Sequence, residues 1–292
     1  MIADLLTGGF GIDCSFLATG FKSATYVERQ EELCEIAAHN FPVLNLNHIN
    51  IKNEDGVTYL QAMSPVDCLF LDPARRNEHG GKTVAISDCE PNVAELEELL
   101  LQKANRVMIK LSPMLDLSLA LKELKQTQEV HILSVNNECK ELLILLGQTS
   151  PAEISIHCVN LFTKGTQKEQ HFVFTREQEQ CSECTYTDSL ETYLYEPNAS
   201  LLKAGAFRSI AAAYPVRKLH PNSHLYTSDT FIENFPGRIF RIVNQCSFNK
   251  KEVKENLADL KKANVTVRNF PATVANESIW LKEEIPTYLP VH

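Results

Sequence analysis

Short apolar segments alternate with amphipathic segments along the first half of this 292-residue chain. A nearly continuous apolar run such as "VDCLFLDP" (66–73) is typical of a strand that is covered on both faces. Segments with helical periodicity, such as 31–41 and 92–104, lie between these runs. This alternation predicts an α/β fold with a doubly wound, mostly parallel sheet.

The expected elements complete this first domain at about residue 176. Strands are expected at 1–6, 24–29, 48–53, 66–73, 106–112, 130–135, 153–162 and 171–175, and helices at 31–41, 92–104, 116–126 and 136–147. The last helix is expected to close at Gly147, because glycine commonly follows a helix C-terminus. The final two strands are expected to form a hairpin around the polar segment 163–170.

A second, smaller α+β domain is expected after a polar linker at 176–193. Its expected elements are a helix at 199–214, a turn-rich piece at 215–229, a strand at 237–248, a helix at 250–263 and a strand at 265–271. The tail that follows has no clear period. The sequence therefore divides into domains at 1–176 and 194–292.

Three glycines follow the first expected strand in the stretch "ADLLTGGFGIDC": Gly8, Gly9 and Gly11. Glycine costs roughly 0.5–1 kcal/mol against alanine inside regular structure, so this density indicates a ligand that approaches the backbone closely. In open α/β sheets, ligands bind beyond the carboxyl ends of the strands. Glu28, which ends the second strand, can accept hydrogen bonds from both ribose hydroxyls of an adenosine, and Asp55 can accept one from an adenine amino group.

A nicotinamide dinucleotide site uses similar parts and is the alternative at this point. The stretch "TGGFGID" does not fit the pattern GxGxxG, because Asp13 occupies the third glycine position. Asp4 and Asp13 would repel an anionic pyrophosphate, whereas a cationic sulfonium that carries an amine would tolerate them. The residues therefore favour a sulfonium cofactor.

A set of residues at strand ends resembles the signature of class I S-adenosylmethionine-dependent methyltransferases: Asp4, Gly8, Gly9, Gly11, Glu28, Asp55 and Asp72-Pro73. Blocks such as "YVERQEEL", "FLDPARR", "IKLSPMLD", "YEPNASLLKAGAF" and "FPGRIFRI" resemble the bacterial methyltransferases that carry a C-terminal THUMP-like, ferredoxin-like domain, over about residues 2–274. The resemblance implies a Rossmann-like sheet, S-adenosylmethionine as cofactor and, because THUMP domains are associated with RNA binding, RNA modification. The cofactor contacts that it implies are Asp4, Thr7, Gly8, Gly9, Gly11, Glu28, Arg29, Asp55 and Asp72.

This sequence departs from the family pattern at both ends. The family carries a further segment before the first strand, which we expect to help cover the cofactor and which is missing here. The tail beyond "RNFPATVA" no longer resembles the family's last strand pair, so an atypical end of the second domain is expected. A cofactor-binding protein that has lost activity through truncation is therefore an alternative.

The motif "FLDPARR" follows the fourth expected strand, where the resemblance places the transferable methyl group. The expected catalytic residues are Asp72, which would orient or deprotonate the acceptor, together with Pro73 and Arg75. The aromatic residue on which amino-group methyltransferases of bases stack a flipped base is absent, although a guanidinium plane can stack as well. Arg75 and Arg76 could instead bind phosphate.

No cysteine nucleophile is expected. Carbon-5 pyrimidine methyltransferases carry one in a Ser-Cys-Asn-Pro motif, and here "SVNN" places Val135 at the thiol position. Cys139 would lie in the helix at 136–147 and pack in the core, so methylation at nitrogen or oxygen is predicted. By position alone, two further groups could line the pocket: Lys110, Ser112 and Asp116, and Ser87, Asp88 and Glu90.

No metal is predicted. Nine scattered cysteines in a chain without a secretion signal are typical of reduced thiols in the cytoplasm. The CxxC pair Cys181 and Cys184 lacks a second pair to complete a zinc site. His220 and His224 lie in a turn-rich piece, where they are not expected to form a helical metal pair.

Charge is distributed unevenly along the chain. Residues 1–150 carry 12 Lys and Arg against 21 Asp and Glu, whereas residues 197–241 carry six against two. The expected RNA contacts are Arg76, Lys203, Arg208, Arg217, Lys218 and His220. The sequence thus predicts a cytoplasmic RNA methyltransferase without a membrane segment. A methyltransferase that acts on a substrate other than RNA is a further alternative.

Overall fold

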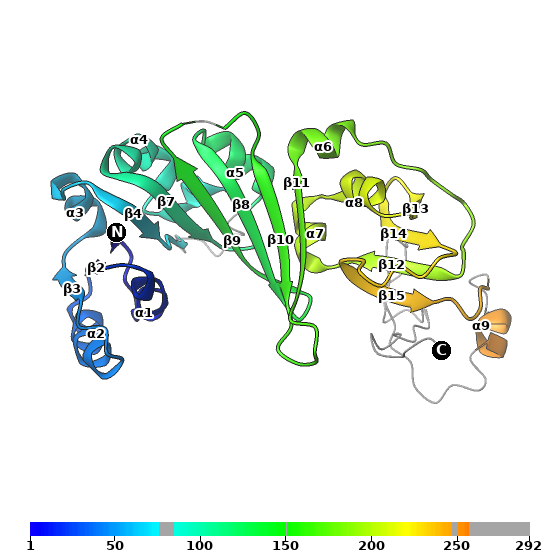
Figure 1. Ribbon diagram of the computed structural model, residues 1–292, viewed down its shortest axis with the longest axis horizontal. Coiled ribbons are helices and arrows are strands. Elements are labelled where there is room, and N and C mark those ends of the chain that lie inside the picture. Colours follow the sequence, from blue (N-terminus) through cyan, green and yellow to red (C-terminus); the bar gives the residue numbers. More distant parts are fainter. Residues whose placement is uncertain (76–84, 150, 247–249, 257–292) are drawn as a thin grey trace.

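The computed structural model describes residues 1–75, 85–149, 151–246 and 250–256, which form a large sheet and a small one (Figure 1). The large sheet consists of β1 (Ile2–Leu5), β2 (Ser23–Glu28), β3 (Ile49–Asn53), β4 (Val66–Leu71), β7 (Ala104–Leu111), β8 (Thr127–Val135), β9 (Glu138–Gly147), β10 (Ser155–Leu161) and β11 (Glu169–Thr175). Its helices are α1 (Ile12–Leu17), α2 (Glu31–Val43), α3 (Gly56–Ala62), α4 (Val93–Lys103) and α5 (Leu117–Glu123).

The strand order is β11-β10-β8-β9-β7-β4-β1-β2-β3. Strands β3, β2, β1, β4 and β7 pair in parallel, β9 lies antiparallel between β7 and β8, and β11 is antiparallel to β10. The expected doubly wound α/β sheet is therefore confirmed, and so is the final hairpin. Because the chain crosses from β1 to β2 and β3 on one side and to β4 on the other, a crevice is expected beyond the end of β1.

Side-chain caps start the helices that follow β3, the β5/β6 hairpin and β7. Asp55, Asn92 and Asp116 each accept a hydrogen bond from a backbone amide in the first turn of α3, α4 and α5, respectively. Such caps satisfy amide groups that have no partner within the helix. β5 (Ala74–Arg75) and β6 (Cys89–Glu90) form a separate short hairpin between β4 and α4.

The expectation of a helix at 136–147 is wrong, because this segment forms β9. Asn136 and Asn137 adopt positive φ angles of 49° and 66°, so they make the tight turn that joins two antiparallel strands. Leu142, Ile144 and Leu146 then alternate on the buried face of the sheet. Gly147 accordingly ends a strand instead of capping a helix.

The small antiparallel sheet has the order β13-β14-β12-β15, from β12 (Tyr193–Pro197), β13 (Arg217–His220), β14 (Ser223–Ser228) and β15 (Gly237–Arg241). Its helices are α7 (Ala199–Ala204), α8 (Phe207–Ala213) and α9 (Lys250–Asn256), and α6 (Arg176–Cys181) begins the linker. A smaller α+β domain is thus confirmed. The single helix expected at 199–214 is two helices, since Gly205 has a φ of 75°. The turn-rich piece contains the hairpin of β13 and β14, and the expected strand at 265–271 lies outside the described residues.

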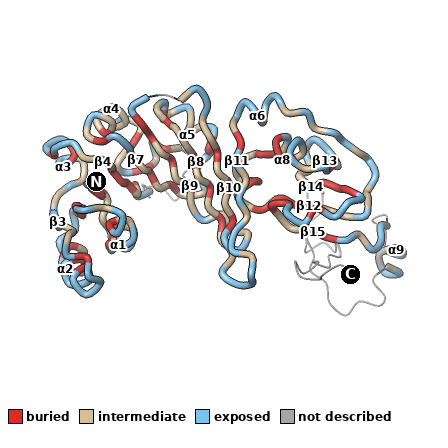
Figure 2. The backbone as a smooth tube through the Cα atoms, in the orientation of Figure 1, coloured by how far each residue is buried: buried red, intermediate tan, exposed pale blue. Residues whose placement is uncertain are grey.

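A cluster of buried apolar residues extends from the large sheet into the small one, and Figure 2 shows buried segments in both. Helix α7 packs against β8, β9 and β10. The Asn137 side-chain oxygen accepts the amide hydrogen of Ala199 at 2.7 Å, and Lys203 Nζ donates to the Leu115 carbonyl at 2.6 Å. None of the helices in the described part of the chain is long and apolar enough to cross a membrane.

Candidate functional site

The glycines of the loop between β1 and α1 meet different surroundings. A Cβ on Gly8 would overlap the Tyr26 ring, 2.6 Å from its Cζ, and one on Gly11 would lie 3.0 Å from Phe41. A Cβ on Gly9 would meet nothing within 4 Å, although its φ of 52° strains any other residue. Gly8 and Gly11 are therefore needed for packing, and only Gly9 presents bare backbone to open space.

Glu28 holds this loop at the end of β2. Its Oε2 accepts the amide hydrogen of Gly9 at 2.8 Å, and its Oε1 accepts that of Gln30 at 3.0 Å. The Tyr26 hydroxyl donates to the carbonyl of Gly9 from the same strand. The buried carboxylate thus fixes the peptide groups on both sides of the position at which a ligand would lie.

Thr7 connects the glycine loop to the end of β4. Its hydroxyl oxygen accepts the amide hydrogen of Asp72 at 2.6 Å. The Asp72 carboxylate in turn lies 2.9 Å from Lys110 Nζ on β7, and the same ammonium lies 2.6 Å from Asp13 Oδ2 at the start of α1. Lys110 therefore bridges two carboxylates, one from α1 and one from the end of β4.

Burial and this bridge act in opposite directions on the pKa of Asp72 and of Lys110. Burial raises the pKa of Asp72 and Lys110 opposes the rise, while the charge of Asp13 adds to it. Burial alone would lower the pKa of Lys110, but its contacts with Asp13 and Asp72 together raise it. The sequence pointed to Lys110 by its position alone. Its two ion pairs, with Asp13 in the first turn of α1 and with Asp72 after β4, could not be read from the sequence.

A cavity of about 520 Å³ opens at the carboxyl ends of β1, β2 and β4. The expected cofactor contacts that line it are Thr7, Gly9, Glu28, Arg29, Asp55 and Asp72. Glu90 and Glu95 also line it, and Arg29 pairs with Glu90 at 3.1 Å. Five carboxylates and one guanidinium therefore surround this space.

A second cavity of about 340 Å³ shares Asp72 and Ala74 with the first. Pro73, Lys110, Ser112 and Lys140 are among the residues that line it. Asp72 therefore stands between two adjoining cavities, one lined with acids and one that contains lysines. This arrangement can hold a donor molecule on one side and an acceptor on the other.

Some expected site residues have internal partners instead. Asp4 is buried beneath the loop, where burial raises its pKa and the Tyr59 hydroxyl donates to its Oδ2 at 3.0 Å. Asp116 caps α5. Asp55 uses Oδ1 to cap α3, and Oδ2 takes no part in that cap. Arg75 lies in β5, and Arg76 lies outside the described residues.

The cations of the second domain differ strongly in exposure. Lys218 is 1% exposed, its ammonium donates to the carbonyls of His220 and Pro221 at 2.7 Å, and burial lowers its pKa. Nothing in this geometry supports an RNA contact by Lys218, or by Lys203, which is bound to a carbonyl of the first domain. Arg208 and His220 are exposed.

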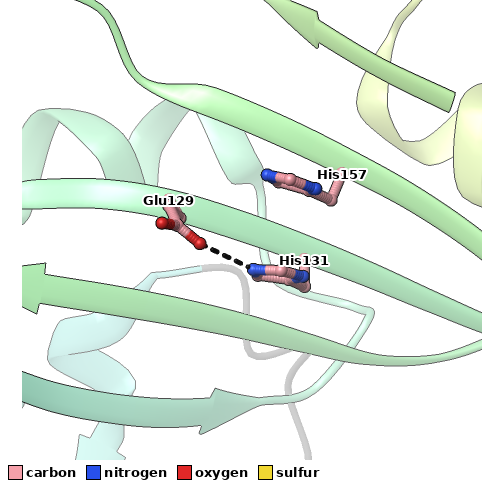
Figure 3. Close-up of side chains that lie close together, drawn as sticks. All are labelled: Glu129, His131 and His157. Atoms are coloured by element: carbon pink, nitrogen blue, oxygen red, sulfur yellow. Dashed lines mark hydrogen bonds and ion pairs between the residues drawn. The ribbon is translucent and has the colours of Figure 1, made fainter.

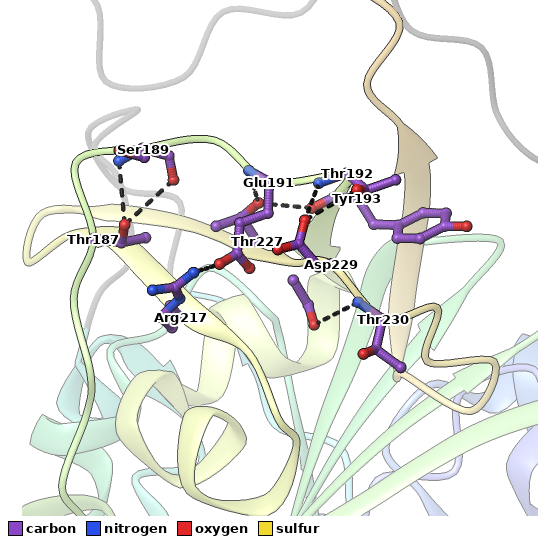
Figure 4. Close-up of polar contacts among 10 residues, drawn as sticks. Thr187, Ser189, Glu191, Thr192, Tyr193, Arg217, Thr227, Asp229 and Thr230 are labelled. Atoms are coloured by element: carbon purple, nitrogen blue, oxygen red, sulfur yellow. Dashed lines mark hydrogen bonds and ion pairs between the residues drawn. The ribbon is translucent and has the colours of Figure 1, made fainter.

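Arg217 belongs to a polar network that fastens the end of the linker to the small sheet (Figure 4). It pairs with Glu191, whose amide hydrogen is accepted by Thr227 Oγ1 at 2.8 Å. Asp229 Oδ1 accepts both the amide and the hydroxyl hydrogens of Thr192. About half of the Arg217 side chain is still exposed.

Cys139 lies in β9, not in a helix, and packs against the buried core. Burial raises its pKa, which keeps the thiol protonated and weakly nucleophilic. The expectation of a packed cysteine therefore agrees with its surroundings, although the expected element was wrong.

Both the second domain and the whole chain are similar to known proteins. Residues 193–236 match a ferredoxin-like domain, and residues 237–276 match a domain described as THUMP domain-like. A crystal structure from Porphyromonas gingivalis W83, described as a "putative methyltransferase", is 36% identical, with a TM-score of 0.83 over 93% of this chain and 68% of that chain. The fold and these matches define a class I methyltransferase sheet with a THUMP-like domain. The chain belongs to the family of this methyltransferase, whose members carry a C-terminal ferredoxin-like, THUMP-like domain.

Two further solved structures are more distant. A conserved hypothetical protein of Streptococcus pyogenes is 15% identical, with a TM-score of 0.38 over 52% of this chain and 89% of that chain. An rRNA methylase from Streptococcus thermophilus is 14% identical, with a TM-score of 0.38 over 50% and 86%. Nothing about this chain follows from such low scores. A search of curated proteins found no match.

Proposed function

We propose that this protein transfers a methyl group from S-adenosylmethionine to a nitrogen or oxygen atom of RNA. The observation that carries the proposal is the convergence of Gly9, Glu28, Asp55 and Asp72 on one cavity at the carboxyl ends of the parallel strands. We assign cofactor binding and chemistry to residues 1–176, and RNA binding to residues 194–292.

The volume and charge of the first cavity suit this cofactor. Five carboxylates around about 520 Å³ suit a sulfonium that carries an amine and oppose an anionic pyrophosphate. Each Glu28 oxygen accepts one backbone hydrogen and keeps a second lone pair for a ribose hydroxyl. Asp55 Oδ2 is the expected acceptor for an adenine amino group, and Gly9 allows close approach to the loop.

Asp72 would act on the acceptor side of the site. When bound, S-adenosylmethionine supplies an already activated methyl group, so the protein mainly needs to align a lone pair and exclude water. Asp72, fixed by Thr7 and Lys110, can accept a hydrogen bond or a proton from the acceptor atom. Ser112 and Lys140 in the second cavity offer donors to a polar acceptor.

The RNA part of the proposal rests on the THUMP-like match and on exposed cations. Arg208, Arg217, His220 and Arg241 are exposed within the basic segment 197–241, and phosphate contacts from such groups dominate nucleic-acid affinity. Arg75 and Arg76 come shortly after Asp72 and Pro73 in the sequence, and we propose that they bind phosphate.

A methyl-transfer assay with labelled cofactor and RNA that lacks modifications tests the proposal. We expect transfer by the wild type and a loss of about 10²–10⁴-fold in Asp72→Ala with most cofactor affinity retained, since orienting or general-base groups contribute this much. Cys139→Ser is the control and should transfer as well as wild type. Binding of the cofactor without methyl transfer would support the alternative of a cofactor-binding protein without activity. Methyl transfer to proteins or small molecules alone would exclude RNA as the substrate. If the wild type forms a covalent adduct with RNA and Cys139→Ser does not, methylation at carbon 5 with a cysteine nucleophile would replace methylation at nitrogen or oxygen.

A further inference from the structure

A cluster of histidines lies on the large sheet, on β8, β10 and β11. Strands β8 and β10 are parallel and in register, so that Glu129 lies opposite Ser155 and His131 lies opposite His157. Residues two apart along a strand share a face, and these four polar side chains therefore form two adjacent rows on one surface. Figure 3 shows the two histidine rings one above the other, beside Glu129.

The Nε2 atom of each ring lies close to an oxygen atom of the residue two positions earlier on its own strand. His131 Nε2 lies 3.1 Å from Glu129 Oε2, and His157 Nε2 lies 3.2 Å from Ser155 Oγ, in the neighbouring row. The ring centroids are 4.4 Å apart with an angle of 10° between the planes. One ligand atom from each of Glu129, His131 and His157 lies within 4.8 Å of the other two.

His171 on β11 supplies the contact that orients the second ring. His157 Nδ1 lies 3.4 Å from His171 Nε2, and their ring centroids are 5.6 Å apart. In the tautomer in which Nδ1 donates to His171, His157 Nε2 carries a lone pair, which accepts from the Ser155 hydroxyl and which a metal ion would take in its place. Metal-binding histidines usually donate their other ring nitrogen in this way, which fixes both tautomer and orientation.

The cluster is reachable from solvent but stands on a rigid base. The side chains of Glu129 and His131 are 45% and 27% exposed. On the opposite face of the same strands, Val130, Ile132 and Ile156 are buried in the core. An ion could therefore reach the side chains, while the strands that carry them are held in place.

We infer that Glu129, His131 and His157 bind a divalent transition-metal ion such as zinc, with His171 as a positioning residue. Two imidazole nitrogens and one carboxylate oxygen suit zinc, nickel or copper and not magnesium or calcium, which prefer oxygen ligands alone. Zinc–nitrogen bonds of about 2.1 Å place two ligand atoms about 3.4 Å apart, so side-chain rotations that tilt the two stacked rings toward one another would close the site from separations within 4.8 Å. This inference does not depend on methyl transfer. It adds a metal where the sequence predicted none.

Titration calorimetry with zinc chloride on chelator-treated protein without a histidine tag tests the site. We expect one zinc ion per chain, and at least a tenfold loss of affinity in His131→Ala and in His157→Ala. His171→Gln should lower affinity about 10–100-fold, the usual effect of a residue that orients a ligand. The matched control is His39→Ala, which removes an exposed histidine of α2 and should bind zinc like the wild type.

Zinc-dependent histidine resonances in the NMR spectrum of the wild type provide a test that needs no variant. Three of the nine histidines, His131, His157 and His171, should shift together at one equivalent of zinc. Equal affinity in the wild type and the His131→Ala/His157→Ala double variant would overturn the inference. Shifts spread over all nine histidines would also overturn it.

Discussion

Alanine substitutions at three glycines separate packing from ligand binding in the loop after β1. Gly8→Ala places a methyl group inside the Tyr26 ring and should cost about 1–3 kcal/mol of unfolding free energy, as expected for an overpacked core. Gly9→Ala meets no atom, and its cost of about 1–2 kcal/mol comes from the left-handed backbone alone. Gly20→Ala has open space and no positive φ, so its effect should stay within about 0.5 kcal/mol.

Binding of S-adenosylhomocysteine distinguishes Gly9 from the other two positions. At Gly9 the added methyl group would point into open space beside the cavity, so we expect at least a tenfold loss of affinity in addition to the loss of stability. Denaturant unfolding and calorimetry on the same samples give both quantities. Wild-type affinity in Gly9→Ala, or a loss of affinity in Gly20→Ala as large as that in Gly9→Ala, would contradict the role of Gly9 in ligand binding.

Three further predictions concern charges. Lys110→Met should lower the unfolding free energy by about 1–3 kcal/mol in denaturant titrations, because Asp13 and Asp72 lose the ammonium that bridges them. The same change should raise the pKa of Asp72 further. Lys110→Arg should recover part of the lost unfolding free energy. Burial and the neighbouring Lys218 lower the pKa of His224, so the unfolded chain binds a proton at this residue at a higher pH than the folded chain. The folded chain should therefore lose stability as the pH falls below 6.5. In unfolding titrations across that pH range, His224→Phe should reduce this loss. Charge reversal at Arg208 and Arg241 should weaken RNA binding and flatten its salt dependence in filter-binding assays while cofactor affinity is kept; unchanged salt dependence would contradict a phosphate contact.

The sequence predicted the sheet well where the apolar pattern had one interpretation. Strand β4 was found because a nearly continuous apolar run is typical of a strand that is covered on both faces. The segment of β9 was predicted wrongly, because its leucine, lysine and glutamate residues have high helix propensity. The two asparagines before it were the signal for a hairpin, and pairing with β7 and β8 overrode the helix propensity.

The sequence predicted single residues of the candidate site but not the contacts between them. Strand ends pointed to Glu28 and Asp72, since parallel strands bring their carboxyl ends together. The ion pairs of Lys110 and the burial of Lys218 depend on side-chain packing, which residue spacing does not encode. The register that aligns His131 with His157 likewise appears only when β8 and β10 pair.

Calorimetric titration of the wild type and Glu28→Ala with S-adenosylhomocysteine tests the assignment of the cofactor site most directly. We predict that the wild type binds, and that Glu28→Ala loses about 1–3 kcal/mol of binding free energy, because ribose hydroxyls lose a charged acceptor and the Gly9 amide loses its partner. A circular dichroism spectrum like that of the wild type shows that the variant is folded. Unchanged affinity in Glu28→Ala, or binding of NADH in place of S-adenosylhomocysteine, would contradict the account.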